Sequence, residues 1–484
     1  MPLVERVLDR TECRTLSDHE ERGGGRGLTA ARRVDAEVIV DELAAAGLRG
    51  RGGAGFPTAV KWRSVLEGTG QVPPTVVVNA AEGEPSTFKD RQLLRTNPYR
   101  VLEGALIAAH VVDAPEVVVA MKGSFGRELR AVRRAGEELH DAGWTDGVDL
   151  RIVEGPSEYL FGEETALLEV IAGRRPFPRV APPYRRGVEQ PSPDGSNPAS
   201  DVALVGDLSS AAAPALANNV ETLANVPAIV AEGAEWFRQV GTVESPGTIV
   251  CTMTGRCATH AVGEVAMGTT LREAIELIGD GAATGRIAGA LSGVANPIVP
   301  EHLLDTPLSY ESMREIGSGL GAAGFHVMDD TSDVVALAAG VARFLSIESC
   351  GQCEPCKRDG LAIAAQLAGH DRNADPADQL DRLDALLDTV TDGARCALAT
   401  QQQQVVRSVL DLYPHAMGEV AAEGVEVEPI LPLVDIVDGR AVLDTSHLSK
   451  QPDWSHDDAD SGAWPAAQGQ LVESGVGVSR TITR

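Results

Sequence analysis

Apolar positions in the first half of the chain follow two different periods. Two short β-branched runs, Thr75–Val78 and Val117–Val119, are typical of strands buried on both faces. Helical spacing predicts helices around them, over Val34–Leu48, Pro98–Val111 and Ser124–Ala142. Strands that alternate with helices predict an α/β domain with a mostly parallel sheet. We assign this domain to residues 31–240, after a polar, glycine-rich and partly ordered arm at residues 1–30.

The pattern changes twice in the second half. Thr248–Met253 reads as a strand and Leu271–Ile278 as a short helix, which predicts a compact α+β domain at residues 245–332. From Val334 the chain turns helical, so we expect a helical bundle at residues 333–425. Its helices are expected over Val334–Leu345, Leu361–Leu367, Pro376–Val390 and Gln401–Leu412.

The last sixty residues have a different sequence pattern again. Leu433–Val437 and Arg440–Leu443 flank Asp438-Gly439, which is a strong hairpin signal. Acidic and small residues follow and are typical of a disordered tail. We assign residues 426–484 to a β-hairpin and an acidic tail, and we predict that this part docks a partner subunit.

Length and charge limit the possible functions. A chain of 484 residues is too long for one core. Its formal net charge of -28 repels nucleic acid and anionic lipid. No apolar segment at the start resembles a signal peptide, and no stretch reaches the ~18 apolar residues of a membrane helix. We therefore expect a cytoplasmic protein with no nucleic-acid partner and no direct membrane insertion.

The cysteines carry the strongest chemical signal. Cys350, Cys353 and Cys356 are separated by three residues each, and Cys396 follows forty residues later. Thiolates at this spacing can hold three corners of a [4Fe–4S] cluster while a distant fourth completes it. Zinc is the main alternative, but structural zinc sites usually consist of two separated ligand pairs. The other three thiols, Cys13, Cys251 and Cys257, give no such pattern, and the last two are expected to be core residues.

The loop Gly50-x-Gly52-x-x-Gly55 formally matches a dinucleotide-binding pattern. A helix precedes it, however, and Pro57 follows it, so we reject the ordinary dinucleotide interpretation. Its free backbone N–H groups, with Arg51 and Lys61 nearby, could still bind a phosphate. A flexible turn between two elements is the alternative.

Three polar segments adjoin predicted strand and helix ends. Asn79–Pro85 follows a strand directly, at the edge where parallel sheets bind ligands. Phe161–Thr165 and Asn218–Thr222 each open a helix, so their polar side chains could be simple caps.

Together these segments resemble the flavoprotein (F) subunit of respiratory complex I. The same family includes the diaphorase subunits of NAD-reducing hydrogenases and the β subunits of NAD-dependent formate dehydrogenases. The resemblance covers about residues 35–410, through GLRGRGGAGFPTAVKW (47–62), NAAEGEPSTFKDR (79–91), YLFGEETALLE (159–169), NNVETLANVP (218–227) and ESCGQCEPCKRDG (348–360).

The resemblance implies a fold and a set of roles. The fold would be an α/β FMN-binding domain, then a ubiquitin-like β-grasp (SLBB) domain and a helical iron–sulfur bundle. The FMN ligands would be Gly50, Arg51, Gly52, Lys61, Asn79, Glu82, Glu163, Asn218, Asn219 and Thr222. The nucleotide NAD(H) would contact Phe56, Glu84, Tyr159 and Glu164, and the [4Fe–4S] cluster would be held by Cys350, Cys353, Cys356 and Cys396.

The implied function is electron transfer between NAD(H) and the cluster through FMN, with no catalytic acid or base. Expected partners are a thioredoxin-like [2Fe–2S] subunit and an iron–sulfur/molybdenum- or hydrogenase-type subunit of a larger complex. The chain departs from the family at Ala81, Ser64, Ala181 and Phe161. Ala81 stands where the family usually has an Asp beside the flavin. Ser64 and Ala181 lie where the family binds the adenosine half of NAD(H). The alternative is therefore an FMN and iron–sulfur scaffold that has lost nucleotide binding. The terminal substrate, the direction of electron flow and the stoichiometry stay open.

Overall fold

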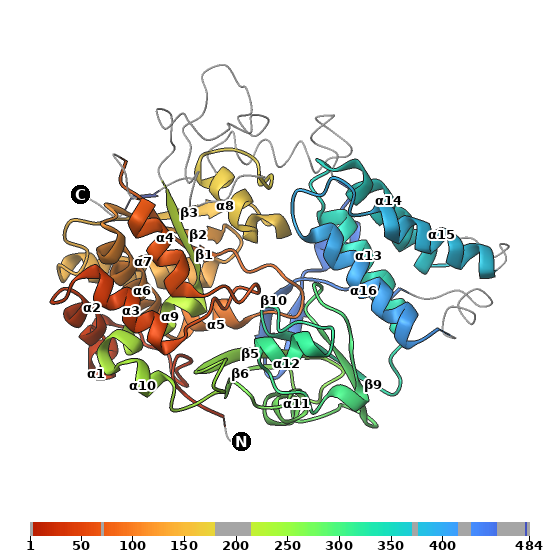
Figure 1. Cartoon of the computed structure of the whole chain (residues 1–484), viewed down its shortest axis with the longest axis horizontal. Coiled ribbons are helices and arrows are strands. Elements are labelled where there is room, and N and C mark those ends of the chain that lie inside the picture. Colours follow the sequence, from red (N-terminus) through yellow and green to blue (C-terminus); the bar gives the residue numbers. More distant parts are fainter. Residues whose placement is uncertain are drawn as a thin grey trace, which may run out of the picture.

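The computed structural model of the chain describes residues 3–68, 72–179, 214–369, 376–414, 427–452 and 480–481 (Figure 1). An α/β unit, a mixed sheet and a helical bundle follow one another along the chain. The predicted fold class is confirmed, and its order is that expected from the sequence.

The α/β unit is built on a sheet in the order β12-β3-β2-β1-β4. Its strands are β1 (Thr75–Ala80), β2 (Glu116–Lys122), β3 (Asp149–Gly155), β4 (Ala215–Asn219) and the two-residue edge strand β12 (Arg480–Thr481). Strands β1 to β4 are parallel, and β12 is antiparallel to β3. Because successive side chains point to opposite faces, Val76 and Val78 join the large core on one face while Val77 joins a smaller core on the other.

Helices cover both faces of this sheet. They are α3 (Ala36–Ala46), α4 (Thr58–Gly68), α5 (Lys89–Thr96), α6 (Pro98–Val112), α7 (Gly126–Asp141), α8 (Glu164–Ile171), α9 (Val220–Glu232) and α10 (Ala234–Phe237). Helix α6 packs closely on α9, where a Cβ at Gly104 would lie 2.1 Å from the Leu223 carbonyl oxygen. The smaller core pairs Val77 with Leu167 and Leu168 of α8.

The amino-terminal arm is more ordered than the sequence suggested. Residues 3–35 contain α1 (Leu16–Glu21) and α2 (Arg26–Ala31) and pack on the α/β unit. Two buried carboxylates hold the arm: Glu264 accepts the backbone N–H groups of residues 6–8, and Glu103 accepts those of Gly25 and Leu28. These partners lie far away in the sequence, so local composition did not reveal them.

The mixed sheet has the order β6-β5-β9-β7-β8, with the parallel pair β5 and β9 at its centre. Its strands are β5 (Thr248–Gly255), β6 (Ala261–Ala266), β7 (Ile287–Ser292), β8 (Val299–Pro300) and β9 (Gly324–Asp329). Helix α11 (Leu271–Gly279) packs on β5 and β6, and the short α12 (Tyr310–Glu315) and the 3₁₀ helix η4 (Glu301–Leu303) lie in the connections. Cys251 and Cys257 are buried in this core, as expected.

The helical bundle consists of α13 (Val334–Glu348), α14 (Glu354–Leu367), α15 (Pro376–Thr389) and α16 (Leu398–Leu412). Helix α14 begins seven residues before its predicted start at Leu361. No helix among the described residues is long and apolar enough to cross a membrane.

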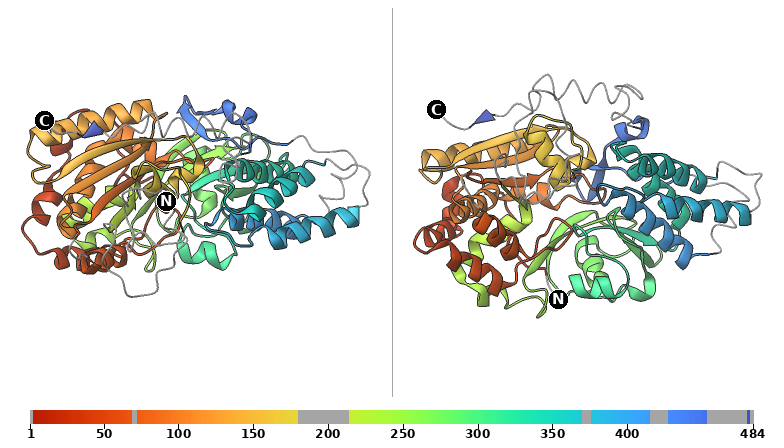
Figure 2. Two further views of the ribbon diagram at one scale, coloured as in Figure 1. Left: turned by 90° about the horizontal axis from the view of Figure 1, so that it is seen from above. Right: turned by 45° about the horizontal axis from the view of Figure 1, so that its top comes forward.

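The predicted hairpin is present as β10 (Leu433–Val437) and β11 (Arg440–Leu443), followed by the 3₁₀ helix η5 (Thr445–Ser449). Asp438 and Gly439 have positive φ angles of 48° and 70°, as their turn requires. This segment lies between the α/β unit and the helical bundle (Figure 2). Arg91 donates to the carbonyl oxygens of Leu433 and Val434, so the hairpin is bound by its own chain. The acidic residues Asp457, Asp458 and Asp460 lie outside the described residues.

Candidate functional site

The candidate site begins at the carboxyl edge of the parallel sheet. Asn79 of β1 pairs in register with Asn219 of β4, so two predicted FMN ligands lie on adjacent strands. Asn219 then caps α9 by accepting the N–H of Glu221, and the Asn79 amide donates to the Gly162 carbonyl oxygen at 2.8 Å. Three segments far apart in the sequence therefore meet at one strand end, as expected for a ligand site of an α/β sheet.

The glycine loop faces the amino terminus of α9. The Arg51 N–H donates to the Thr222 hydroxyl at 2.8 Å, and a Cβ at Gly52 would lie 3.2 Å from the Asn219 side chain. The glycine loop thus places its backbone beside the amino terminus of α9 and leaves space there for a ligand. A helix amino terminus favours a bound anion. The Arg51 side chain points elsewhere and donates to the Thr248 carbonyl oxygen at 3.0 Å.

Several predicted ligands already have protein partners. Lys61 pairs with Glu164 at 2.8 Å, so a predicted FMN ligand contacts a predicted nucleotide ligand. Asn218 accepts from the indole of Trp62 at 2.9 Å. These contacts hold the polar groups in position at the strand ends.

Two carboxylates of the site cap helices. Glu82 accepts the backbone N–H groups of Asp90 and Arg91 at the start of α5, and Glu163 accepts those of Thr165 and Ala166 at the start of α8. Burial raises the pKa of both carboxyls, although the cap hydrogen bonds oppose the shift. The capping alternative weighed from the sequence therefore holds for Glu163, whereas the similar role of Glu82 was not foreseen. Neither role prevents these carboxylates from lining a cavity.

The predicted nucleotide contacts do not all lie together. Glu84 accepts the Val294 N–H at 3.1 Å, and burial raises the pKa of its carboxyl to about 7. A side chain at Gly293 would collide with this carboxylate, so a glycine is required there. Tyr159 lies near Glu84, and the Tyr159 N–H donates to Glu348 at the end of α13. Phe56 is half-exposed on the glycine loop.

One cavity of about 200 Å³ brings the separate groups together. Its lining includes the predicted FMN ligands Gly52, Asn79, Glu82, Glu163 and Asn219, the predicted nucleotide contacts Glu84 and Tyr159, and the cluster ligand Cys396. The sites predicted for the flavin, the nucleotide and the cluster thus share one cavity wall.

The four cysteines surround the start of α14 and the start of α16. Burial raises the pKa of the Cys396 thiol to about 12, and the neighbouring Cys350 and Cys356 add to this shift. Ser349 and Gln352 lie within hydrogen-bonding distance of the Cys356 and Cys350 sulfurs, at 3.3 and 3.4 Å. Among the described residues no group of three or more His, Cys, Asp or Glu side chains is arranged to hold a single metal ion, whereas a [4Fe–4S] cluster binds each of its thiolates at a different iron atom. A donor set of four sulfurs suits an iron–sulfur cluster, whose ligands are thiolates.

The structure also locates the departures from the family. Ala81 is fully buried beside the cavity, and the Ser64 hydroxyl donates back to the Val60 carbonyl oxygen within α4. Phe161 is buried against Gly155, where a side chain would collide with its ring. Ala181 lies outside the described residues.

A buried charge network behind the cavity was missed from the sequence. Lys89 donates to Glu221 at 2.7 Å and to Asp90 at 3.0 Å, and the side chains of Lys89 and Glu221 are at most 1 % exposed. Asn219 donates to Asp90 at 2.6 Å, which links the network to the cavity. Glu221 lies within the polar segment Asn218–Thr222 and Asp90 lies five residues after Asn79–Pro85, but no local signal shows that they meet.

Tyr310 of the mixed sheet unit was also missed. Its hydroxyl donates to the Gly50 carbonyl oxygen at 2.8 Å, and its ring fills the space that a side chain at Gly55 would need. The mixed sheet unit therefore fixes the glycine loop, and Gly55 is required for this close packing.

Two family models match the chain. One, described as the Nuo51 FMN-binding domain, matches residues 43–228, and the other, the NADH-ubiquinone oxidoreductase-F iron-sulfur binding region, matches residues 336–420. An FMN-binding domain and a [4Fe–4S] binding region in one chain, joined at one cavity, define a flavin- and iron–sulfur-containing NADH dehydrogenase subunit.

Curated relatives cover nearly the whole chain. The second F-type subunit of the NADH-quinone oxidoreductase of Rhizobium meliloti is 34 % identical over 426 residues, which are 84 % of this chain and 95 % of the relative. The F-type subunit of the Streptomyces coelicolor NADH-quinone oxidoreductase is 31 % identical and covers 88 % of this chain and 93 % of its own. The chain belongs to the family of F-type subunits of NADH-quinone oxidoreductase. Among solved structures, a NAD+-reducing [NiFe]-hydrogenase in the H2-reduced state matches with a TM-score of 0.70 and 30 % identity, over 87 % of this chain and 67 % of that one.

Proposed function

We propose that this chain is the NAD(H)-linked electron-transfer subunit of a multisubunit oxidoreductase, and that electrons pass between NAD(H) and a [4Fe–4S] cluster through FMN. One observation carries the proposal: residues predicted for the flavin and the nucleotide share a cavity wall with the cluster ligand Cys396. A flavin accepts the two electrons of a hydride and releases them one at a time to a cluster.

The role of the chain in this chemistry is binding and positioning. The glycine loop and the start of α9 would bind the FMN phosphate, since N–H groups and the helix dipole favour an anion there. Asn79, Glu163 and Asn219 would orient the ring system, and Glu84 and Tyr159 would hold the nicotinamide end of the nucleotide. Cys350, Cys353, Cys356 and Cys396 would hold the cluster. No side chain needs to act as a general acid or base.

The test is anaerobic addition of NADH to the purified chain while the visible flavin band is followed. Bleaching of the band, together with the electron paramagnetic resonance signal of a reduced cluster, supports the proposal. A flavin that dithionite bleaches and NADH does not would refute the NAD(H) part while leaving FMN and cluster in place.

Partners follow from the same proposal. We propose a cytoplasmic complex with a thioredoxin-like [2Fe–2S] subunit and a catalytic subunit of the hydrogenase, formate dehydrogenase or complex I type. The similarity to the hydrogenase structure supports the hydrogenase type. Co-purification of the tagged chain from its native host, followed by mass spectrometry, would identify the catalytic subunit.

A second candidate is an FMN and iron–sulfur scaffold without nucleotide binding. The Lys61–Glu164 ion pair and the inward-turned Ser64 hydroxyl favour it, because they leave fewer free groups for an adenosine nucleotide. In that case NADH and NAD+ would not change the flavin spectrum, whereas a reduced partner protein would.

A further inference from the structure

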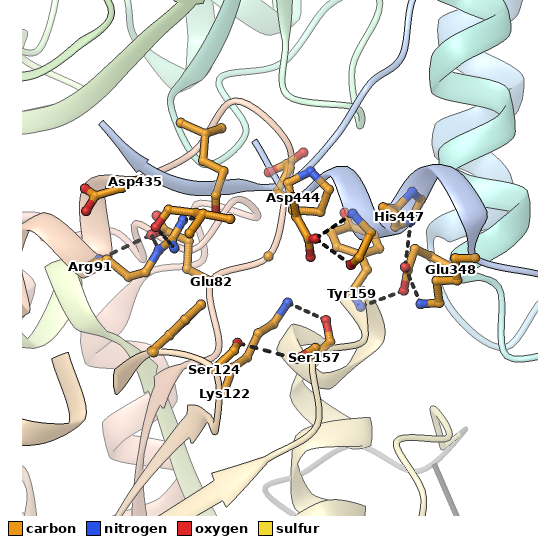
Figure 3. Close-up of a pocket in the computed structure, with 18 of the residues that line it drawn as sticks. Glu82, Arg91, Lys122, Ser124, Ser157, Tyr159, Glu348, Asp435, Asp444 and His447 are labelled. Carbon is orange, nitrogen blue, oxygen red and sulfur yellow. Dashed lines mark hydrogen bonds and ion pairs between the residues drawn. The ribbon is translucent and has the colours of Figure 1, made fainter. Parts of the chain in front are cut away.

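A second and larger cavity lies on the other side of the Glu82–Glu84 loop. It has a volume of about 720 Å³ and shares Glu82, Gly83, Glu84 and Tyr159 with the smaller cavity. The ends of β2 and β3, the start of α7, the end of α13 and the segment 432–451 enclose it (Figure 3). Its volume is within the range of ligand pockets, roughly 300–1,000 Å³.

Most cations of this wall pair with a carboxylate, whereas the carboxylates Glu84 and Asp444 accept only uncharged donors within the described part of the chain. Arg91 pairs with Glu82, Arg95 pairs with Glu128 and Asp435, and Lys450 pairs with Glu348. Arg127 pairs with Glu12. Asp444 accepts the N–H and the hydroxyl of Ser446.

Among the described cations of the wall, Lys122 alone has no carboxylate within ion-pair distance. Its side chain is 4 % exposed, and its ammonium donates to the Ser157 carbonyl oxygen at 3.0 Å but forms no ion pair with any described carboxylate. Glu348 and Glu158 act on it only through space, and burial raises the pKa of the Glu158 carboxyl. A buried ammonium without a counter-ion is costly unless an anion joins it.

Further donors converge beside Lys122. Figure 3 shows its side chain pointing from the end of β2 into the cavity, with Ser124 and Ser157 next to it. The two serine hydroxyls lie 3.4 Å apart. The sixteen-residue helix α7 begins at the same place, and no side chain caps its first N–H groups. Ammonium, hydroxyl and free N–H groups together form the donor set that binds a phosphate.

Part of the cavity lining is apolar. Phe125, Tyr159, Phe344 and Leu433 line the cavity, so it has room and surface for more than an inorganic ion. We propose that this cavity binds an organic phosphate of mononucleotide size, with its phosphate at Lys122, Ser124 and the start of α7. This site is distinct from the FMN and nicotinamide sites proposed above, although it shares the Glu82–Glu84 loop with them.

The test uses the full chain loaded with flavin and cluster, and AMP as the probe in isothermal titration calorimetry. We expect saturable binding that Lys122→Met weakens at least tenfold. Lys122→Arg keeps the charge and should bind within about threefold of the original protein. Ser124→Leu changes an exposed residue and places an apolar group at the phosphate position, so it should show the loss in a folded protein even if Lys122→Met folds poorly.

Two results would overturn the inference. One is the absence of AMP binding by the original protein at millimolar concentration. The other is binding that Lys122→Met and Ser124→Leu leave intact and that Phe56→Ala removes, because Phe56 is a predicted NAD(H) contact and this pattern would assign AMP to the nicotinamide nucleotide site. Flavin bleaching by NADH, measured in the same variants, reports separately on the proposed function.

Discussion

Replacement of Lys89 by methionine tests whether the buried charge network supports the flavin cavity. Methionine keeps much of the length of the side chain and removes its charge. The Lys89 ammonium donates to Glu221 and Asp90 at 2.7 and 3.0 Å, and it lies 3.5 Å from the Asn219 amide oxygen. The substitution therefore removes the nearest cation from two carboxylates and a contact from the cap of α9.

The expected cost is large because the network is buried. Removal of one partner of a buried ion pair costs about 3–5 kcal/mol. Glu221 keeps the Val250 N–H at 3.0 Å and the Arg51 guanidinium at 3.7 Å, so the lower end applies. We expect a loss of about 3 kcal/mol in the free energy of unfolding, which is roughly a 150-fold change in the equilibrium constant.

Lys61→Met is the matched control. The Lys61–Glu164 distance is 2.8 Å, almost the same as that of the buried pair, but the two side chains are 25 % and 36 % exposed. Exposed pairs contribute less than about 1 kcal/mol. Because the two distances are nearly equal, the difference in stability loss between the two variants reports the effect of burial.

Urea unfolding of the FMN-free protein, followed by far-ultraviolet circular dichroism, measures the loss of stability in each variant, because Lys61 is itself a predicted FMN ligand and bound FMN would add to the stability. Quenching of flavin fluorescence measures the affinity for FMN. Lys89→Met should weaken both the stability and the FMN affinity. Adding Glu221→Gln should recover part of the stability, because it removes the nearer of the two carboxylates that Lys89 neutralised, while Asp90 keeps the Asn219 amide. Equal losses of stability in Lys89→Met and Lys61→Met would refute the reasoning. An unchanged FMN affinity in Lys89→Met would also refute it.

Three further predictions concern other parts of the molecule. Cys396→Ser should lower the iron content and remove the cluster signal while FMN stays bound, as shown by iron analysis and absorbance. Glu84→Gln should unfold at the same urea concentration as the original protein near pH 5 and at a higher one at pH 8. The reason is that the Glu84 pKa of about 7 lies above its ordinary 4.5, so the original protein loses stability as pH rises from 4.5 to 7, by at most about 3 kcal/mol. Deletion of residues 430–484 should weaken assembly with the partner subunits while flavin content is unchanged, and normal assembly on size-exclusion chromatography would contradict it.

Elements with local signals were predictable from the sequence. The hairpin β10–β11 has the expected boundaries because Asp438-Gly439 accepts the positive φ angles that a tight turn needs. Strands β1 and β2 were found because their apolar runs are continuous. Helix α14 was predicted too short, since its first turn contains Pro355 and Cys356 and lacks apolar periodicity, although proline is well tolerated in a first turn.

The site was predictable only as a set of motifs. Asn79, Asn219 and Glu163 lie at strand and helix ends whose positions follow from the fold, and the cavity does contain them. Long-range contacts were not predictable. The contact of the Arg51 side chain with Thr248 and the packing of Tyr310 on the glycine loop are two examples. Both join residues that are about 200 or more positions apart in the sequence. No local pattern encodes such a pairing.

The contact between Arg91 and the hairpin has a consequence for biosynthesis. Arg91 and Leu433 are 342 residues apart, and a ribosome adds roughly 5–20 residues each second, so about 17 to 70 s separate their synthesis. Once β4 has been made, the four parallel strands of the nascent sheet can fold while the segment that encloses the larger cavity does not yet exist. Loading of the flavin can therefore precede closure by the hairpin, and the four-thiol pocket is complete only after Cys396 has left the ribosome. The order of synthesis thus completes the flavin cavity and the four-thiol pocket together, once residues 396–401 are made, and leaves closure by the hairpin until last.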